Sequence, residues 1–176
     1  MPRLFVAVGL PTSITTALAR LQPPPSAGIR LTPPAQMHLT LHFLGEANLE
    51  RMASALERAT VPAFSLAING LGRFSSAGGA VTLWAGVRAT PELLAAHAAV
   101  AAALASEGFQ PEARPYTPHI TLARCAPEAP PGTVEAFLAQ HAGISLPAVP
   151  VTTFGLYSSR SLADVPVYEC ERSFPL

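Results

Sequence analysis

The sequence predicts an α+β fold in which two lobes, related by a pseudo-twofold axis, place mainly antiparallel sheets along a central cleft and helices on the outer faces. Two observations lead to this prediction. The strings His38-Leu39-Thr40-Leu41 and His119-Ile120-Thr121-Leu122 repeat one pattern in the two halves of the chain. The order strand, helix, motif strand, helix, strand, strand also occurs twice, which indicates an internal duplication. We therefore expect one two-lobed domain over residues 1–176, with approximate repeats 1–80 and 81–176.

Composition restricts the class of protein. Hydrophobic residues make up 49% of the 176 residues and charged residues 12%, yet no stretch reaches the ~20 apolar residues of a membrane span. The formal net charge is zero, which argues against a protein that grips long nucleic acid. The N-terminal segment runs into a strand and is too short for a signal peptide, so we expect a cytoplasmic location. Cys125 and Cys170 have neither a zinc-ligand nor a redox-pair spacing and are expected to be packing residues.

The first half is expected to alternate strands and helices. Leu4–Leu10 is an apolar run with β character, and a helix follows over 11–21. Pro23–Pro25 must form a loop, because successive prolines prevent both a helix and a strand ladder. Asn48 is a candidate N-cap for a helix that reaches Arg58. Two further strands are expected over 64–68 and 80–87, with a Gly/Ser-rich turn at 75–79 between them.

A strand expected over 36–44 carries the first motif. Side chains alternate between the two faces of a strand. Strict alternation gives one face with His38, Thr40 and His42 and another with Leu39, Leu41 and Phe43. Gly45 is expected to end this strand.

The second half repeats the order of the first. Thr90 resembles an N-cap and Pro91 a first helical residue, so a long helix is expected to run to Gly108. The elements expected after it are a strand over 118–124 with the second motif, a helix over 133–141, and strands over 149–158 and 165–174.

Paired His-x-Thr strands suit acid–base chemistry on a phosphodiester without a metal. Histidine titrates near pH ~6.5 and can give or take a proton near neutrality. His38 and His119 on opposite sides of a phosphorus atom would allow in-line displacement. The hydroxyls of Thr40 and Thr121 can donate hydrogen bonds to the nonbridging oxygens, where negative charge builds up. Arg124 would add a permanent positive charge, provided that a bulge or the strand end turns it to the face of His119.

The motif segments also resemble those of a known family. Met37–Gly45 and Pro118–Arg124 are similar to the paired signatures of the two-histidine phosphoesterase superfamily, and within it to the RNA 2',3'-cyclic phosphodiesterases, historically described as 2'–5' RNA ligases. Shorter matches extend over nearly the whole chain, at Arg3–Ala7, Leu83-Trp84, Gly108-Phe109 and Phe174–Leu176.

This resemblance implies metal-independent hydrolysis of an RNA 2',3'-cyclic phosphate end, or of a small cyclic nucleotide, to a 2'-phosphomonoester. It makes His38 the general acid for the leaving 3' oxygen and His119 the general base for the attacking water. Thr40, Thr121 and Arg124 would hold the phosphate. No metal, organic cofactor or membrane partner is implied, and a monomer is expected. Family members also join RNA ends by the reverse reaction without ATP, and the sequence leaves open whether this chain does so.

Three other functions compete with this one. A noncatalytic module that binds RNA ends or nucleotides is the strongest alternative, and it would bind cyclic-phosphate ends without turnover. A metal-dependent hydrolase could use His38, His42 and His119, but the chain has a single aspartate and no His/Glu cluster. A serine hydrolase is disfavoured because no Gly-x-Ser-x-Gly string occurs.

The remaining histidines and aromatic residues receive mainly structural interpretations. His42 is expected on the face of the first motif histidine, where it would line the site or lie at a solvated edge. His97 and His141, on expected helices, are interpreted as structural. Aromatic faces can stack a base, and the candidates are Tyr116, Phe43 and Phe74, of which at least two are expected in the core.

Overall fold

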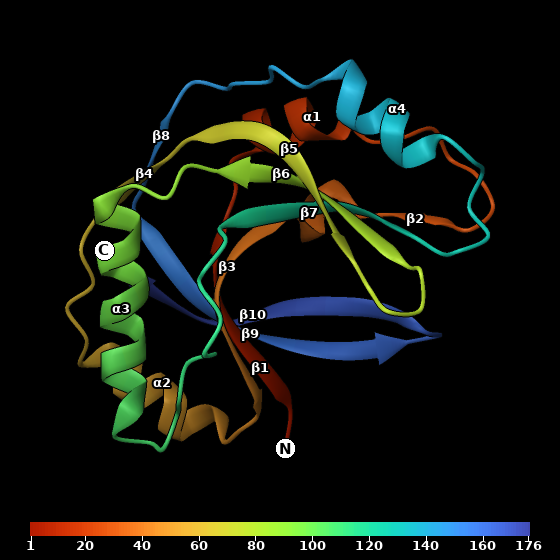
Figure 1. Ribbon diagram of the computed structural model, residues 1–176. Helices are drawn as coiled ribbons and strands as arrows, with labels where there is room; N and C mark the ends of the chain where they lie inside the picture. Colours follow the sequence, from red (N-terminus) through yellow and green to blue (C-terminus); the bar gives the residue numbers. More distant parts are fainter.

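The computed structural model describes all residues 1–176 (Figure 1). Its helices are α1 (Thr12–Ala19), α2 (Leu49–Glu57), α3 (Pro91–Ala105) and α4 (Thr133–Gln140), with one short 3-10 helix, η1 (Pro34–Gln36). Its strands are β1 (Arg3–Gly9), β2 (Ile29–Leu31), β3 (His38–Glu46), β4 (Phe64–Leu66), β5 (Ile68–Ser75), β6 (Val81–Val87), β7 (His119–Cys125), β8 (Val149–Val151), β9 (Thr153–Leu162) and β10 (Val165–Pro175). None of the helices combines the length and apolar character needed to cross a membrane.

Two four-stranded antiparallel sheets form the centre of the molecule. The first sheet has the strand order β10-β9-β1-β3 and the second β2-β7-β6-β5, while β4 and β8 form a separate pair. Strands are exchanged between the halves of the chain, because β5 pairs with β6 in the second sheet and β9 returns to β1 in the first. The predicted α+β fold with mainly antiparallel sheets is confirmed.

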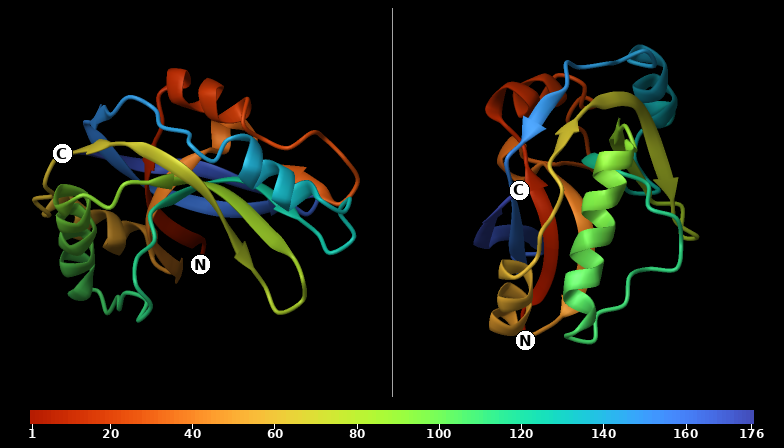
Figure 2. Two further views of the ribbon diagram at one scale, coloured as in Figure 1. Left: turned by 45° about the horizontal axis from the view of Figure 1, so that its top comes forward. Right: turned by 90° about the vertical axis from the view of Figure 1, so that its left-hand side faces the viewer.

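The helices divide between the two sheets. α2 and α3 lie side by side against the first sheet, and α1 and α4 lie beside the second (Figures 1 and 2). The two predicted caps are present. The side chain of Asn48 accepts a hydrogen bond from the Arg51 amide at 3.0 Å, and the Thr90 hydroxyl accepts one from the Leu93 amide at 3.2 Å. Each cap satisfies an amide that the first helical turn leaves unpaired.

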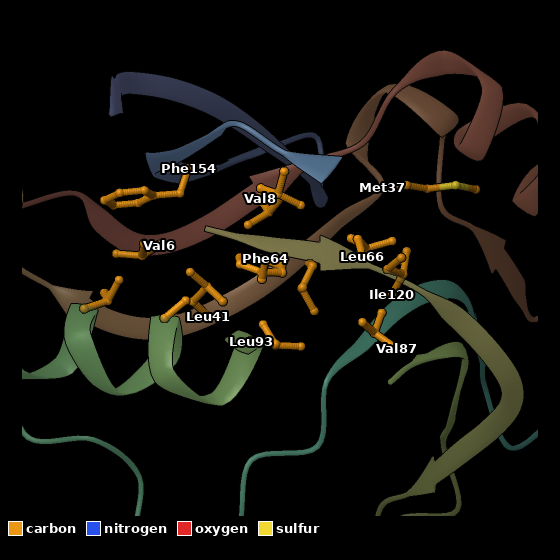
Figure 3. Packing of buried hydrophobic residues seen from close by; sticks show 14 of the residues in the cluster. Val6, Val8, Met37, Leu41, Phe64, Leu66, Val87, Leu93, Ile120 and Phe154 are labelled. Atoms are coloured by element: carbon orange, nitrogen blue, oxygen red, sulfur yellow. The ribbon is translucent and has the colours of Figure 1, made fainter. Parts of the chain in front are cut away.

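One hydrophobic core joins the two sheets. It contains 34 buried residues, among them Val6 of β1, Leu41 of β3, Leu93 of α3 and Ile120 of β7 (Figure 3). Burial of one such aliphatic side chain contributes roughly 1.5–3 kcal/mol. The apolar residues of both motifs therefore anchor β3 and β7, and the faces that carry the histidines are left for chemistry.

Several predicted boundaries were wrong. The single strand predicted over 64–68 is two, β4 and β5, and β5 continues to Ser75; the one predicted over 149–158 is also two, β8 and β9. Gly45 does not end β3. It adopts a φ of +69°, which glycine reaches without steric cost, and the strand continues to Glu46 after a bulge. β2 was not predicted, because three residues are too few to show a periodic pattern.

Candidate active site

The two motif strands hold their histidines in equivalent registers. β3 is the edge strand of the first sheet and contacts β7 of the second. His38 pairs in register with Gly9 of β1, and His119 pairs with Gly86 of β6. Each imidazole thus stands across from a glycine. Other groups of the protein use the space that a side chain would take there: a Cβ atom at Gly9 would meet the Tyr157 hydroxyl at 3.5 Å, and one at Gly86 would clash with the Asn69 carbonyl oxygen.

Both imidazoles are held in the same way. Nδ1 of His38 donates a hydrogen bond to the carbonyl oxygen of Gln36 at 2.7 Å, and Nδ1 of His119 donates one to the carbonyl oxygen of Thr117 at 2.7 Å. A carbonyl can only accept, so each neutral ring carries its proton on Nδ1. Nε2, which has no partner in the protein, is the nitrogen available for proton transfer on each ring.

The pKa of each motif histidine lies below the ordinary value of 6.5. Burial is the main cause of the lowered pKa of His38; the Gln36 carbonyl opposes it, and the charge of His119 adds to it. Burial also dominates the lowered pKa of His119, against the Thr117 carbonyl, with further lowering from nearby arginines, first Arg124 and then Arg114. The two imidazoles are close enough for the charge of one to act on the other, and both are mainly neutral at pH 7.

Two hydroxyls accompany the histidines. Thr40 and Thr121 are half-buried, and each lies two residues after its histidine on the same strand face. Neither hydroxyl makes a hydrogen bond within the protein, whereas the carbonyl oxygen of Thr40 accepts a 2.7 Å bond from the Tyr116 hydroxyl. That bond ties β3 to the segment before β7, so the two motifs are joined by a direct contact.

A bulge in β7 turns Arg124 to the side of His119. Thr121 pairs with Trp84 and Ala123 with Leu83, so Leu122 is an extra residue in the ladder. Leu122 and Ala123 are consequently both fully buried, and Arg124 is exposed on the histidine side. Its Nη1 donates to the Thr82 hydroxyl at 3.3 Å. The sequence required such a bulge if Arg124 was to reach the site, and the structure contains it.

The same bulge in β3 overturns the predicted position of His42. Thr40 pairs with Ala7 and His42 with Val6, so Leu41 is the extra residue. His42 is only 5% exposed and points away from His38; Nε2 donates to the His97 carbonyl oxygen at 2.7 Å, and the two rings stack at 3.9 Å. Strict alternation failed because a sequence pattern does not reveal an inserted residue. We call the face that carries the two motif histidines the motif face, and His42 does not belong to it.

Phe43 takes the place on the motif face that His42 was predicted to occupy. Its side chain is 60% exposed, and its ring centroid lies 6.2 Å from that of Phe5. Phe74 is 41% exposed, so the prediction that at least two of the three candidate stacking residues are core was wrong. Only Tyr116 is largely enclosed, with its ring stacked on His97 at 4.0 Å. His97 has the structural role predicted for it.

Aromatic rings surround each histidine, and of these rings the sequence indicated only Phe74 as a candidate for the site. Around His38 lie Phe5 at 5.0 Å, Tyr168 at 5.2 Å and Tyr157 at 6.5 Å. Around His119 lie Phe74 at 4.9 Å and Trp84 at 5.7 Å. These rings come from β1, β5, β6, β9 and β10, so only the sheet pairing assembles them.

Glycine makes room for one of these rings. A Cβ atom at Gly72 of β5 would lie 2.2 Å from two ring atoms of Trp84, which pairs with it across the strands. The indole therefore lies over the glycine backbone, where its Nε1 is buried without a hydrogen-bond partner. Such a close approach is a common reason for glycine inside a strand.

Other surface features lie apart from the motif face. Cavities of about 310 and 630 Å³ are lined by residues of α2 and α3 and by residues around Phe64 and Leu176, respectively. No three His, Cys, Asp or Glu side chains are grouped so that they could hold a metal ion. Cys125 is buried, as expected of a packing residue, but Cys170 is exposed, so that prediction was wrong for the second cysteine. Cys170 pairs with Tyr157 at the side of the first sheet that faces His38.

Comparison with known proteins agrees with this geometry. Residues 10–161 match the 2'-5' RNA ligase superfamily. The chain belongs to this superfamily. It is 31% identical, over 98% of its length, to an RNA 2',3'-cyclic phosphodiesterase of Geobacillus stearothermophilus, of whose length it spans 56%. It is 29% identical to the RNA 2',3'-cyclic phosphodiesterase of Archaeoglobus fulgidus, with 98% of this chain and 99% of the relative covered.

Solved structures of other proteins share the fold. TT0787 of Thermus thermophilus superimposes with a TM-score of 0.78 at 29% identity and covers 99% of this chain and 97% of that one. LigT of Escherichia coli in complex with 3'-AMP gives a TM-score of 0.75 at 26% identity and covers 99% and 98% of the two chains. The resemblance predicted from the two motifs is confirmed.

Proposed function

We propose that this protein hydrolyses 2',3'-cyclic phosphate ends of RNA to 2'-phosphomonoesters, with the two motif histidines as acid and base and without a metal. The observation that carries this proposal is the equivalent anchoring of His38 and His119. On two contacting strands, each Nδ1 is bonded to a backbone carbonyl and each Nε2 is left without a partner. The names of the curated relatives support the same reaction.

The proposed step is an in-line displacement at phosphorus. Nε2 of His119 takes a proton from a water molecule whose oxygen forms the new bond to phosphorus. The bond from phosphorus to the 3' oxygen breaks, and protonated Nε2 of His38 gives its proton to that oxygen. The products are a 2'-phosphomonoester and a free 3' hydroxyl, and the two histidines have exchanged their protonation states.

The lowered pKa values of His119 and His38 have different consequences for the base and for the acid. A low pKa keeps His119 neutral near pH 7, as a base must be. His38 must be protonated, and the negative charge of a bound phosphate beside it raises its pKa toward the working range. Binding of the anionic substrate thus supplies the charge that the acid needs.

The phosphate contacts come from side chains that have few partners in the protein. Thr40 and Thr121 offer their hydroxyl hydrogens to the nonbridging oxygens, and the guanidinium of Arg124 balances the charge that builds up there. Solved complexes of LigT with phosphate and with 3'-AMP support phosphate and nucleotide binding at 26% sequence identity.

Further proposals concern the wider behaviour of the protein. We propose that it acts as a monomer in the cytoplasm on RNA ends or small cyclic nucleotides, and that it can join RNA ends by the reverse reaction without ATP. We also propose that residues 1–80 and 81–176 are two copies of one unit. Equivalent pairing of β1 with β3 and of β6 with β7, bulges included, supports this duplication.

The decisive experiment uses EDTA-treated protein and a short RNA that ends in a 2',3'-cyclic phosphate, with separation of 2'- from 3'-phosphate products. Conversion to the 2'-phosphate that is lost in His38→Ala and His119→Ala is the expected result. Loss of activity on EDTA treatment, restored by a divalent cation, would contradict the metal-independent mechanism. Tight binding of the cyclic end without turnover would instead support a noncatalytic RNA-end module.

A further inference from the structure

Arg30 of β2 stands beside Arg124 without a carboxylate partner. The two residues are direct cross-strand partners, so their side chains leave the same face of the second sheet, which is the motif face. Both are exposed. Arg30 takes part in none of the ion pairs or side-chain hydrogen bonds of the protein, and the one side-chain bond of Arg124 is to Thr82. Like charges directly opposite each other are unfavourable, and an anion between them removes the penalty.

The backbone of β2 is held at both ends, so this arrangement is built into the fold. At one end, the Gly28 carbonyl accepts a 2.7 Å hydrogen bond from the Ala126 amide. At the other, the Thr32 amide donates to the carbonyl oxygen of Leu122 at 2.9 Å. The side-chain amide of Gln22 donates to the carbonyl oxygens of Thr32 and Leu122, each at 2.8 Å. Leu122 is the bulge residue of β7, so the same contacts stabilise the bulge that exposes Arg124 and the strand that carries Arg30.

Arg124 and Arg30 lie at different distances from His119, and this difference indicates two separate positions for bound anions. Arg124 lies on the same strand as His119 and lowers its pKa, whereas Arg30 lies one strand farther out, on β2. The reacting phosphate, held between the two histidines, is therefore reached by Arg124. In an RNA end, the next negative charge is the phosphodiester on the 5' side of the terminal nucleotide.

We propose that Arg30 forms a second phosphate site, which binds the phosphodiester on the 5' side of the terminal nucleotide while the cyclic phosphate lies at the histidines and Arg124. This inference rests on the proposed function. It gives the protein a preference for the ends of RNA chains over free cyclic mononucleotides, which lack that phosphodiester. Arginine suits such a site because its planar fork can bind two phosphate oxygens at once.

The test compares kcat/KM for 2',3'-cyclic AMP with kcat/KM for a diribonucleotide that ends in a 2',3'-cyclic phosphate. Arg30→Gln should lower the ratio of the second value to the first by about tenfold, the usual size of a lost charge-assisted hydrogen bond. For the diribonucleotide, the slope of log(kcat/KM) against log salt concentration should become shallower by about one. Arg73→Gln is the matched control: Arg73 is an exposed arginine of the same sheet whose strand partner, Leu83, is fully buried.

The outcomes separate this inference from the proposed function. Equal losses on both substrates, or no loss on either, would overturn the second phosphate site. If the unmodified protein turned over neither substrate, the proposed function would have failed. Equilibrium binding of the same two ligands would then decide the inference, because Arg30→Gln should still weaken binding of the diribonucleotide selectively.

Discussion

The two motif strands share a β-bulge at the same place, but the bulge exposes a different type of residue in each strand. In both strands an extra residue, Leu41 or Leu122, follows the His-x-Thr triplet and reverses the alternation of side chains. The next exposed residue on the motif face is Phe43 in the first strand and Arg124 in the second. The first sheet thus surrounds its histidine with aromatic rings, and the second adds arginines.

We expect this difference to give the two four-stranded sheets separate tasks. The cations beside His119 lower its pKa and so favour the neutral imidazole, and they would attract the phosphate of the proposed substrate. We expect the rings beside His38 to shield it from water and to offer flat surfaces to a sugar or base. The two motif strands therefore differ in the exposed residue that follows each bulge, while their histidines are anchored in the same way.

The largest effect is expected from the histidines themselves. His38→Ala and His119→Ala should each lower kcat by about 10²–10⁴-fold, because each removes a general acid or base. Both variants should fold, since neither imidazole contributes to the core. A substrate with a p-nitrophenolate leaving group needs no acid and should restore much of the rate to His38→Ala but not to His119→Ala. Equal rescue of both variants would contradict the assignment of acid and base.

Substitutions of Arg124 and Phe43, the exposed residues that follow the two bulges, should differ in their effects on kcat/KM. Arg124→Gln removes a charged donor to the transition state and should lower kcat/KM by about 10²–10³-fold. Phe43→Ala removes a stacking surface and should lower kcat/KM by roughly tenfold, mainly through KM. Steady-state kinetics on the cyclic-phosphate RNA checks both values. If Phe43→Ala were as harmful to kcat as Arg124→Gln, the proposed division between the lobes would be wrong.

Substitution of Gly72 tests how tightly the Trp84 indole packs against the second sheet. Gly72→Ala forces the Trp84 ring away from the sheet and toward its neighbour His119. Overpacking of this kind costs about 1–3 kcal/mol of stability, and kcat should fall with it. Gly143→Ala, where a Cβ would meet nothing within 4 Å, is the control. Thermal unfolding and kcat measured on both variants give the answer, and unchanged values for Gly72→Ala would refute the packing argument.

The pH dependence of the rate should reflect the two environments. kcat/KM reports the free enzyme, in which burial lowers the pKa of both histidines, so its bell-shaped profile should have its maximum below pH ~6.5. Arg124→Gln removes a cation near His119 and should raise the pKa of that base, which shifts the acidic limb of the profile to higher pH. A profile without two limbs, or an acidic limb that does not move, would argue against His119 as the base.

The smallest expected effect is on the pH dependence of protein stability, through His97, whose ring stacks on His42 of the first motif strand. Burial, with the nearby His42, lowers the pKa of His97 to about 4 from 6.5. Between these values the unfolded chain binds a proton that the folded protein does not, so stability is full above pH 6.5 and falls as the pH approaches 4. His97→Phe keeps a stacked ring without a charge, and its Tm should decrease less between pH 7 and pH 5. An unchanged decrease would mean that other groups determine the acid lability.

Local information in the sequence was sufficient for most of the fold. The caps at Asn48 and Thr90, the strand character of both motifs and the four helices depend on residues a few positions apart, and these were predicted correctly. The family also followed from the sequence, because the paired His-x-Thr-Leu strings are specific. The sequence by itself thus determined the class of fold, the family and the candidate catalytic pair.

Only the tertiary structure decided which side chains share the motif face. Two bulges moved His42 away from it and brought Phe43 and Arg124 onto it, and a bulge becomes visible only when a strand has a partner. The rings around the histidines and the pairing of Arg30 with Arg124 likewise depend on strands far apart in the chain. Strand pairing is a non-local interaction, so its register cannot be read from the spacing of residues along one segment.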